Sequence, residues 1–349
     1  MVEAERRGAP WPGAVAVSGG SDSLALMLLL ANWAKTRNAA APAVLTVDHG
    51  LRKDSARDAR MVLERANAAK LKAHNLRWRG VKPKSDIEAE ARRARYRLMG
   101  AWCAKHGVTG LYVAHTLEDQ AETFLLRLAR GSGIDGLSAM RVVASLPSQE
   151  HGGMVVVRPL LGIRRERLRG YLAEIGQSWI EDPMNADPRF ARVRVRAAWP
   201  ALTGIGLSPS RIAAAAEHLA RAREALDLQT QSLIAEACRF ERDTVFLDAA
   251  KLASAPREIG MRALAAVLMD VSADDYRPRF ERLERLYTLI CAGQLKSGRT
   301  LHGCRIAPAK KKAAAFFGPA TLLVTPEGAV SRRPDAPGKS EFEHKSGGN

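Results

Sequence analysis

Residues 15–25, VAVSGGSDSLA, run from an apolar, strand-like segment directly into a loop of serine and glycine and then into a helical segment. Gly19 and Gly20 let the backbone turn tightly and approach a ligand without a Cβ atom. Free amides at the start of the following helix attract anions. Three hydroxyl side chains lie in the same loop: Ser18, Ser21 and Ser23. Together these features predict a phosphate-binding cradle.

Asp22 is the acidic residue of this loop, and a carboxylate repels phosphate. We therefore expect Asp22 to hold a Mg²⁺ ion that bridges phosphate oxygens, because Mg²⁺ combines one or two carboxylates with phosphate and water. The alternative is a Gly-Ser turn in which Ser21 and Asp22 only cap a helix. The strand before the loop and the helix after it favour the phosphate site.

Short apolar runs alternate with amphipathic stretches from Ala14 onward, which is typical of β-α-β units. We expect strands at residues 14–17, 43–49, 72–78, 110–115 and 154–160. Helices are expected between them at residues 23–35, 57–70, 85–106 and 118–130. This order predicts an α/β fold, a parallel sheet with helices on both faces.

Turn-forming residues at 201–210, ALTGIGLSPS, interrupt this order, and a domain boundary is expected there. Residues 211–239 and 256–292 have helical patterns, and three short runs after Thr300 (LHGCRIA, AAAFFG, ATLLVTP) are candidate strands. The predicted organisation is a catalytic domain at 1–204, a smaller, mainly helical domain at 205–295, a small element at 296–325 and a disordered tail at 326–349.

The composition is that of a globular protein with a large positive charge. Of the 349 residues, 54 are lysine or arginine and 37 are acidic, a net charge of +17, which suggests a polyanionic partner. An arginine-rich proteome is the alternative explanation, and charge alone does not decide between the two. The four cysteines form no C-x-x-C pair, as expected of reduced cytosolic thiols.

The amino-terminal segment MVEAERRGAPWPG lacks the apolar core of a signal peptide. The apolar run at residues 24–31 is too short to span a membrane. We therefore expect a cytoplasmic protein with no membrane partner.

Two further segments place polar side chains near the predicted sheet edge. VDHGLR, residues 47–52, ends a strand with Asp48 and His49. We expect both side chains to contact a nucleotide, since α/β folds bind ligands at the carboxyl ends of their strands. EAEARRARYRLM, residues 88–99, puts Arg92 and Arg95 on one helix face, where they either point at phosphate or belong to a solvated basic surface.

The segment from Tyr112 to Met140 carries the remaining candidates. His115 follows a strand, and Asp119 and Glu122 share one face of the helix that begins nearby. Acidic residues in a first turn also stabilise the helix dipole, which is an adequate explanation for either carboxylate alone. Two carboxylates together beside His115 are costly unless they meet a cation, so the pair predicts a cation-binding site.

These blocks together resemble the tRNA(Ile)-lysidine synthetase family of PP-loop ATP pyrophosphatases, whose S-G-G-x-D-S signature matches residues 18–23 at every fixed position. The other matching blocks are VDHGLR, the RRARY helix, HTLEDQAETFLLRLARGSGIDGL, RPLL at residues 158–161 and WIEDPMNADPRFARVRVR at residues 179–196. The resemblance covers about residues 14–200. It implies a PP-loop fold of the adenine-nucleotide α-hydrolase type.

In that family, the C2 oxygen of the wobble cytidine in a CAU-anticodon isoleucine tRNA attacks the α-phosphate of ATP, and pyrophosphate leaves. The ε-amine of free lysine then displaces AMP and gives lysidine. The resemblance implies that residues 18–23 bind the phosphates and Mg²⁺, and that Arg95 and His115 contact the nucleotide or the adenylated base. Asp119 and Glu122 would receive the lysine ammonium, and one of them would take its proton.

Two positions depart from the family pattern: Glu118 stands where an aspartate is usual, and Val193 stands where an asparagine is expected. Four arginines beside Phe190 are candidates for contacts with tRNA phosphates: Arg189, Arg192, Arg194 and Arg196. The alternative is a strand-like alternation in which Val193 and Val195 face the core and the arginines lie in water. The helical domain is expected to help recognise the tRNA acceptor region.

Other functions remain open at this point. A PP-loop thiolase needs a nucleophilic cysteine or a C-x-x-C pair, and only Cys103 lies within the first 200 residues. A glutamine-fed amidotransferase needs an ammonia source, and no glutaminase segment is evident. A basic RNA-binding module that kept an ATP loop without catalysis is the alternative from another class.

Overall fold

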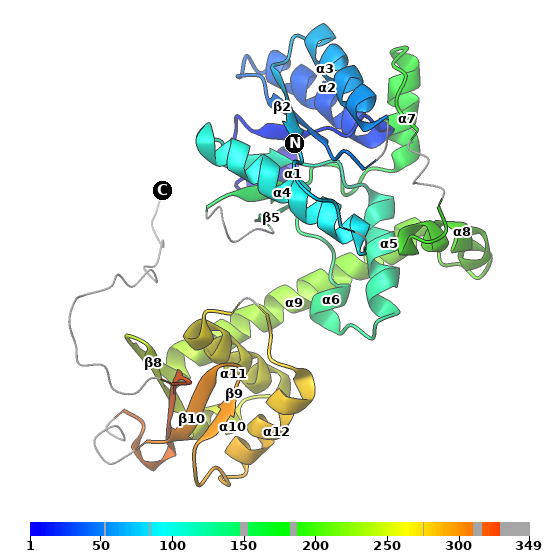
Figure 1. Ribbon diagram of the computed structural model, residues 1–349. Coiled ribbons are helices and arrows are strands. Elements are labelled where there is room, and N and C mark those ends of the chain that lie inside the picture. Colours follow the sequence, from blue (N-terminus) through cyan, green and yellow to red (C-terminus); the bar gives the residue numbers. More distant parts are fainter. Residues whose placement is uncertain are drawn as a thin grey trace. The chain divides into compact units, whose positions relative to one another are not determined.

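The computed structural model describes residues 1–51, 54–83, 85–146, 153–181, 187–274, 276–309 and 316–328. Two compact units make up the chain, residues 1–221 and residues 222–349 (Figure 1). The division falls within the long helix α9 (Pro209–Ala237), whereas the sequence placed a boundary just before that helix. The predicted tail from residue 329 onward lies outside the described residues.

A six-stranded sheet forms the centre of the first unit, in the order β3-β2-β1-β4-β6-β5. The first four strands along the chain are β1 (Ala14–Ala16), β2 (Ala43–Asp48), β3 (Ala73–Arg77) and β4 (Gly110–Tyr112). They pair in parallel with one another and with β6 (Val155–Val157). The predicted α/β fold is therefore confirmed, and β5 (Val143–Ser145), an antiparallel edge strand that the sequence did not indicate, completes the sheet.

Helices cover both faces of this sheet, because the central strands β1, β4 and β6 are apolar on both sides. Neighbouring residues of one strand enter opposite cores: Val15 packs on one side and Ala14 on the other. The Val15 core contains side chains of α2 (Ser21–Thr36), α3 (Ser55–Ala68) and α7 (Arg165–Glu174). The opposite core contains Tyr96, Met99 and Cys103 of α4 (Ile87–Lys105) (Figure 1).

The remaining helices of the first unit lie before β1 or after β4 along the chain. Helix α5 (Leu117–Leu128) comes five residues after the end of β4, and α6 (Ile134–Leu137) follows it. Helix α8 (Ala191–Gly204) packs against α5 and includes Pro200. The short helix α1 (Val2–Arg6) adds Ala4 to the Val15 core. Segments distant in sequence thus meet at one edge of the sheet.

Helices and a five-stranded antiparallel sheet make up the second unit. The expected helical region contains α10 (Ala249–Ser254), α11 (Arg257–Ser272) and α12 (Phe280–Cys291). The sheet has the order β7-β8-β11-β10-β9 and joins early and late segments. Its strands are β7 (Cys238–Glu241), β8 (Thr244–Asp248), β9 (Arg299–Leu301), β10 (Cys304–Pro308) and β11 (Thr321–Pro326), with a 3-10 turn at Gly318–Ala320.

Two of the three candidate strands after Thr300 are therefore strands, although LHGCRIA contributes to both β9 and β10. The third, AAAFFG, spans residues 313–318; its first half lies outside the described residues, and residues 316–317 form a turn that leads into the 3-10 helix at Gly318 rather than a strand. Strand β8 pairs with β11, so β9, β10 and β11 share one sheet with the segment before α10. Over the described part of the chain, no helix combines the length and apolarity needed to cross a membrane.

Candidate active site

A cavity of about 1040 Å³ lies at the carboxyl edge of the first sheet. Residues at the ends of β1, β2 and β4 line it, together with side chains from α2, α4, α5, α7 and α8. Its lining includes six arginines and four carboxylates: Arg92, Arg95, Arg165, Arg169, Arg192 and Arg196, and Asp22, Asp58, Asp119 and Glu181. Such a lining suits an anionic ligand and also offers places for a cation.

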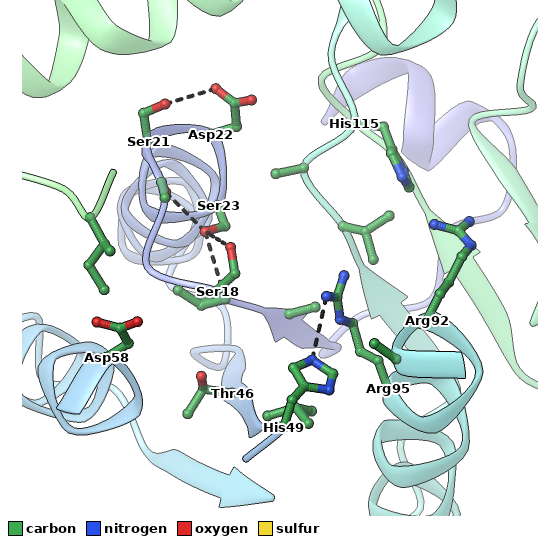
Figure 2. A pocket seen from close by; sticks show the side chains of 18 of the residues that line it. Ser18, Ser21, Asp22, Ser23, Thr46, His49, Asp58, Arg92, Arg95 and His115 are labelled. Atoms are coloured by element: carbon green, nitrogen blue, oxygen red, sulfur yellow. Dashed lines mark hydrogen bonds between the residues drawn. The ribbon is translucent and has the colours of Figure 1, made fainter. Parts of the chain in front are cut away.

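The serine-glycine loop forms one wall of the cavity. Figure 2 shows Ser18, Ser21, Asp22 and Ser23 on one side, with Arg92, Arg95 and His115 across the space from them. The Ser23 hydroxyl donates to the Gly20 carbonyl at 3.0 Å and accepts from the Ser18 amide at 3.2 Å. These bonds hold the loop closed onto the first turn of α2.

Gly19 is required by two features of the loop. Its φ angle is +91°, a backbone conformation that residues other than glycine rarely adopt. A Cβ atom at this position would also lie 2.4 Å from Cδ1 of Ile180. The Ile180 amide donates to the Gly19 carbonyl at 2.9 Å, so the segment before the arginine cluster packs directly on the loop.

Of the two nucleotide contacts predicted at the end of β2, Asp48 and His49, only His49 lines the cavity. His49 lines the cavity, and its Nε2 lies 3.5 Å from Arg95 of α4. Burial, together with the nearby charges of Arg95 and Lys82, lowers the pKa of His49 to about 4. Asp48 is not among the lining residues; its carboxylate accepts from the Gly50 amide at 3.1 Å and from the Ser55 hydroxyl at 2.7 Å, and thereby shapes the turn into α3.

His115 lies at the tip of β4 and lines the cavity as a neutral imidazole. Burial lowers its pKa to about 4, although the neighbouring Asp119 carboxylate acts in the opposite direction. Its buried Nδ1 has no hydrogen-bond partner among the described residues. A buried ring nitrogen without a partner is costly, so this atom is suited to a contact with a bound ligand.

The predicted carboxylate pair lies beside Asp22, and one guanidinium joins all three. Arg165, the first residue of α7, donates to Asp22 at 2.8 Å and lies 3.5 Å from Asp119 and 3.8 Å from Glu122. Glu122 has no solvent-exposed side-chain surface. The structure therefore brings the loop carboxylate and the two helix carboxylates, separated by about a hundred residues, into one cluster.

Local contacts fix the orientation of Asp119. Its Oδ2 accepts from the backbone amide and the hydroxyl of Thr116, at 2.8 and 2.9 Å, in a capping box at the start of α5. Its Oδ1 therefore points toward Arg165 at 3.5 Å and Arg192 at 3.4 Å. Burial acts to raise the pKa of Asp119, but Arg165 and the Thr116 amide hold it below its usual value. Asp119 is thus a stable carboxylate.

The pKa of Asp22 shifts in the opposite direction to that of Asp119. Burial raises the pKa of Asp22, and the attraction of Arg165 offsets this only in part. In the described residues, no group of three or more histidine, cysteine, aspartate or glutamate side chains could hold a metal ion. One carboxylate beside a phosphate cradle still fits Mg²⁺, which keeps water and phosphate oxygens as its other ligands.

The arginine cluster is helical, so the strand-like alternation considered for Val193 and Val195 is wrong. A helix places residues four apart on one face. Arg192 accordingly reaches Asp119, and Arg196 binds Glu122 with two hydrogen bonds of 2.7 and 3.2 Å. The other two arginines lie away from the carboxylates. Arg189 pairs with Asp187 on the surface, and Arg194 donates to the Pro188 and Arg189 carbonyls.

Sequence reasoning missed Arg165 and Thr116. Arg165 follows the RPLL block within GIRRERLR, where several arginines stand close together and no spacing distinguishes one from another. Its backbone amide donates to the Glu118 carboxylate at 2.9 Å. Glu118, which stands where the family usually has an aspartate, therefore anchors the start of α7. Thr116 could have been found from T-x-x-D, a helix-capping pattern before an apolar run.

None of the four cysteines lines the cavity. Cys103 is fully buried in the core between α4 and the sheet. Burial raises its pKa to about 12, so it is a thiol rather than a reactive thiolate at neutral pH. Cysteine-dependent chemistry in this cavity is therefore not supported.

Known proteins resemble the chain closely. A family model described as a PP-loop domain matches residues 12–201. A tRNA(Ile)-lysidine synthase from Ruegeria pomeroyi is 39% identical, and the match covers 83% of this chain and 70% of the relative. A tRNA(Ile)-lysidine synthase from a Bradyrhizobium species is 38% identical over 88% of this chain and 92% of the relative. One from Anaplasma marginale is 36% identical, and this match spans only 62% of the relative's length.

Removal of the Arg196 guanidinium should destabilise the first unit. Arg196→Ala leaves the fully buried Glu122 with only the longer Arg165 contact, and loss of one partner of a buried ion pair costs about 3 kcal/mol. All six tryptophans lie between residues 11 and 199. Urea unfolding followed by tryptophan fluorescence therefore reports on this unit. Arg194→Ala, which removes only bonds to carbonyls, is the control; equal losses in the two variants would contradict the assignment.

His115 should make stability depend on pH. Its pKa is about 4 in the folded chain and 6.5 in its ordinary state, so the unfolded chain binds more protons between those values. The free energy of unfolding should therefore fall as the pH is lowered from 6.5 to 4. His115→Asn removes this proton uptake and should flatten the profile, measured by urea unfolding at several pH values. A variant profile parallel to that of the wild type would show that His115 is not held neutral.

Proposed function

The chain belongs to the tRNA(Ile)-lysidine synthase family of ATP-using PP-loop ligases, and we propose that it joins free lysine to the wobble cytidine of a CAU-anticodon isoleucine tRNA. The observation that carries this proposal is the composition of one cavity. A phosphate cradle forms one wall, and the Asp119 carboxylate lines the cavity beside it. Glu122, fully buried and outside the lining, contacts the same Arg165 guanidinium as Asp119. Cytoplasm is the proposed location, where ATP, lysine and tRNA are all present.

The first step of the proposed reaction is adenylation of the base. The cytidine C2 oxygen attacks the α-phosphorus of ATP, and the bond to the leaving pyrophosphate breaks. Residues 18–23 bind the phosphates through loop amides and hydroxyls, and Asp22 would hold Mg²⁺, which when bound neutralises charge on phosphate oxygens. Arg95 and the neutral His115 lie across the cavity from the loop, in a position to contact the nucleotide or the adenylated base.

The second step uses the carboxylate pair. The ε-ammonium of lysine binds Asp119 and Glu122 and must lose a proton before it can act as a nucleophile. Asp119 is the carboxylate that the ammonium can reach, because it lines the cavity, whereas Glu122 is fully buried and tied to Arg196 by two hydrogen bonds. The free amine then attacks C2 of the adenylated cytidine. The bond between C2 and the oxygen bearing the phosphate breaks, AMP leaves, and lysidine remains.

The tRNA is proposed to bind through surface arginines. Arg189 and Arg194 are exposed and lie beside the cavity-lining residue Phe190, so they remain candidates for phosphate contacts. Arg192 and Arg196 are instead engaged with the carboxylates, which makes them the weaker candidates. By analogy, the second unit would help recognise the acceptor region. Such binding should weaken as salt is added, because phosphate contacts release counterions.

Two alternatives are less well supported. Thiolation needs a cysteine or a cluster near the nucleotide, and the four cysteines of the chain lie outside the cavity. A non-catalytic RNA-binding module gives no role to the acidic side chains of Asp22 and Asp119, which line the cavity beside the phosphate loop. ATP–pyrophosphate exchange that depends on tRNA separates an enzyme from such a module.

Lysine incorporation tests the proposed function directly. The purified protein is incubated with ATP, Mg²⁺, labelled lysine and an unmodified CAU-anticodon isoleucine tRNA, and label in the tRNA is counted. We expect incorporation into this tRNA and none into an initiator methionine tRNA, which also has a CAU anticodon and is the control. AMP formation without lysine transfer would redirect the assignment to another PP-loop tRNA modification.

Substitution of Asp22 and substitution of Asp119 should affect different steps of the proposed reaction, adenylation and lysine transfer. Asp22→Ala is expected to abolish tRNA-dependent ATP–pyrophosphate exchange, because the phosphate site loses its magnesium ligand. Asp119→Ala should retain measurable exchange but block lysine transfer. Glu166→Ala, an exposed position on α7, is the matched control and should leave both unchanged. If Asp22→Ala and Asp119→Ala both exchange and transfer at the wild-type rate, the residue roles are wrong.

A further inference from the structure

The Arg165 guanidinium occupies the place where the proposed function puts a substrate cation. Its side chain is 20% exposed and lies within 4 Å of Asp22, Asp119 and Glu122. The backbone amide of Arg165 is held by Glu118, so the start of its side chain is fixed while the guanidinium reaches into the cavity. The amine-binding carboxylates therefore already have a partner when no lysine is present.

The charges of the cluster are balanced before a substrate or metal ion binds. Three carboxylates (Asp22, Asp119 and Glu122) face three guanidinium groups (Arg165, Arg192 and Arg196). Burial disfavours a charge on Arg165, but the nearby Asp119 and Asp22 carboxylates outweigh this and raise its pKa above the ordinary value. Arg165 therefore stays charged, and its attraction to the carboxylates is not removed by loss of a proton. A lysine ammonium can enter only if a guanidinium moves away.

Arg192 contacts only Asp119, at 3.4 Å, whereas Arg165 contacts both Asp119 and Glu122, so movement of Arg165 would remove a cation from both carboxylates at once. Arg196 makes two hydrogen bonds to the fully buried Glu122. Arg165 makes a short contact of 2.8 Å only with Asp22, which lies at the phosphate loop, and its contacts with Asp119 and Glu122 are long. Its strongest attachment is thus on the nucleotide side of the cavity. A guanidinium binds phosphate oxygens with charge-assisted, often bidentate, hydrogen bonds.

We propose that Arg165 occupies the amine site of the empty enzyme and that the phosphates of bound nucleotide draw its guanidinium away from Asp119 and Glu122, so that lysine binds after the nucleotide. This inference rests on the proposed function, since it takes those two carboxylates as the lysine site. Arg165 acts here as a positioning residue that sets the order of binding. By linkage, lysine tightens nucleotide binding by the same factor.

Titration calorimetry of lysine tests this order. Lysine is added to the protein alone and to the protein saturated with Mg²⁺ and α,β-methylene-ATP, which cannot release pyrophosphate. The wild type should bind lysine roughly tenfold or more tightly with the nucleotide, within the usual range of coupling between sites. Arg165→Gln should bind lysine with similar affinity in both states, because the competing cation is gone. Arg165→Lys should keep a smaller dependence, because its charge remains but its reach is shorter.

Arg167→Gln, an exposed arginine two residues further along α7, is the matched control and should behave as the wild type. Tryptophan fluorescence verifies that each variant is folded. If Arg165→Gln does not fold, the test is the comparison of lysine affinity between Arg165→Lys and the wild type. Equal lysine affinity of the wild type with and without nucleotide would overturn the inference, as would an undiminished nucleotide dependence in Arg165→Lys.

The same measurements separate this inference from the proposed function. A wild type that incorporates lysine into tRNA but binds it independently of nucleotide refutes the role of Arg165 alone. A wild type that neither binds lysine in the presence of nucleotide nor incorporates it refutes both.

Discussion

Glu122 is a carboxylate with no exposed side-chain surface, and a buried charge of this kind is tolerated only when cations and hydrogen bonds surround it. Much of the site follows from this constraint. Arg196 reaches Glu122 from α8, which packs against α5, and Arg165 links the start of α7 to Glu122 by a side-chain contact. Asp119 and Asp22 complete the charge balance. The ion cluster therefore connects the phosphate loop to the amine side of the cavity.

The parallel sheet makes this cluster possible. Strands β1 and β4 are neighbours, and both end at the same edge. The loop after β1 carries Asp22, and the turn after β4 carries His115 and leads into α5 with its two carboxylates. Both steps of the proposed reaction thus share one cavity. An adenylated base formed at the loop need not leave for lysine to reach it.

Much of this arrangement could be predicted from local patterns. The alternation of strands and helices, the phosphate loop, and the spacing of Asp119 and Glu122 are encoded over a few residues each. The structure confirms the alternation and places the loop and Asp119 in the cavity lining, whereas Glu122 is fully buried outside that lining. Asp48 ends β2, but its carboxylate accepts hydrogen bonds from Gly50 and Ser55, and it does not line the cavity. Arg165 was missed because its role depends on tertiary contacts across more than 40 residues of sequence. No periodicity or motif in the sequence indicates such a contact.

The central claim is that one cavity first adenylates a cytidine and then replaces AMP by lysine. Its most direct test uses ATP labelled at the α-phosphate, incubated with the protein and the CAU-anticodon isoleucine tRNA without lysine. We predict that label accumulates on the tRNA and that addition of unlabelled lysine releases it as AMP, with one lysidine formed for each AMP released. Absence of label on the tRNA, or release of AMP without lysidine, would contradict this account.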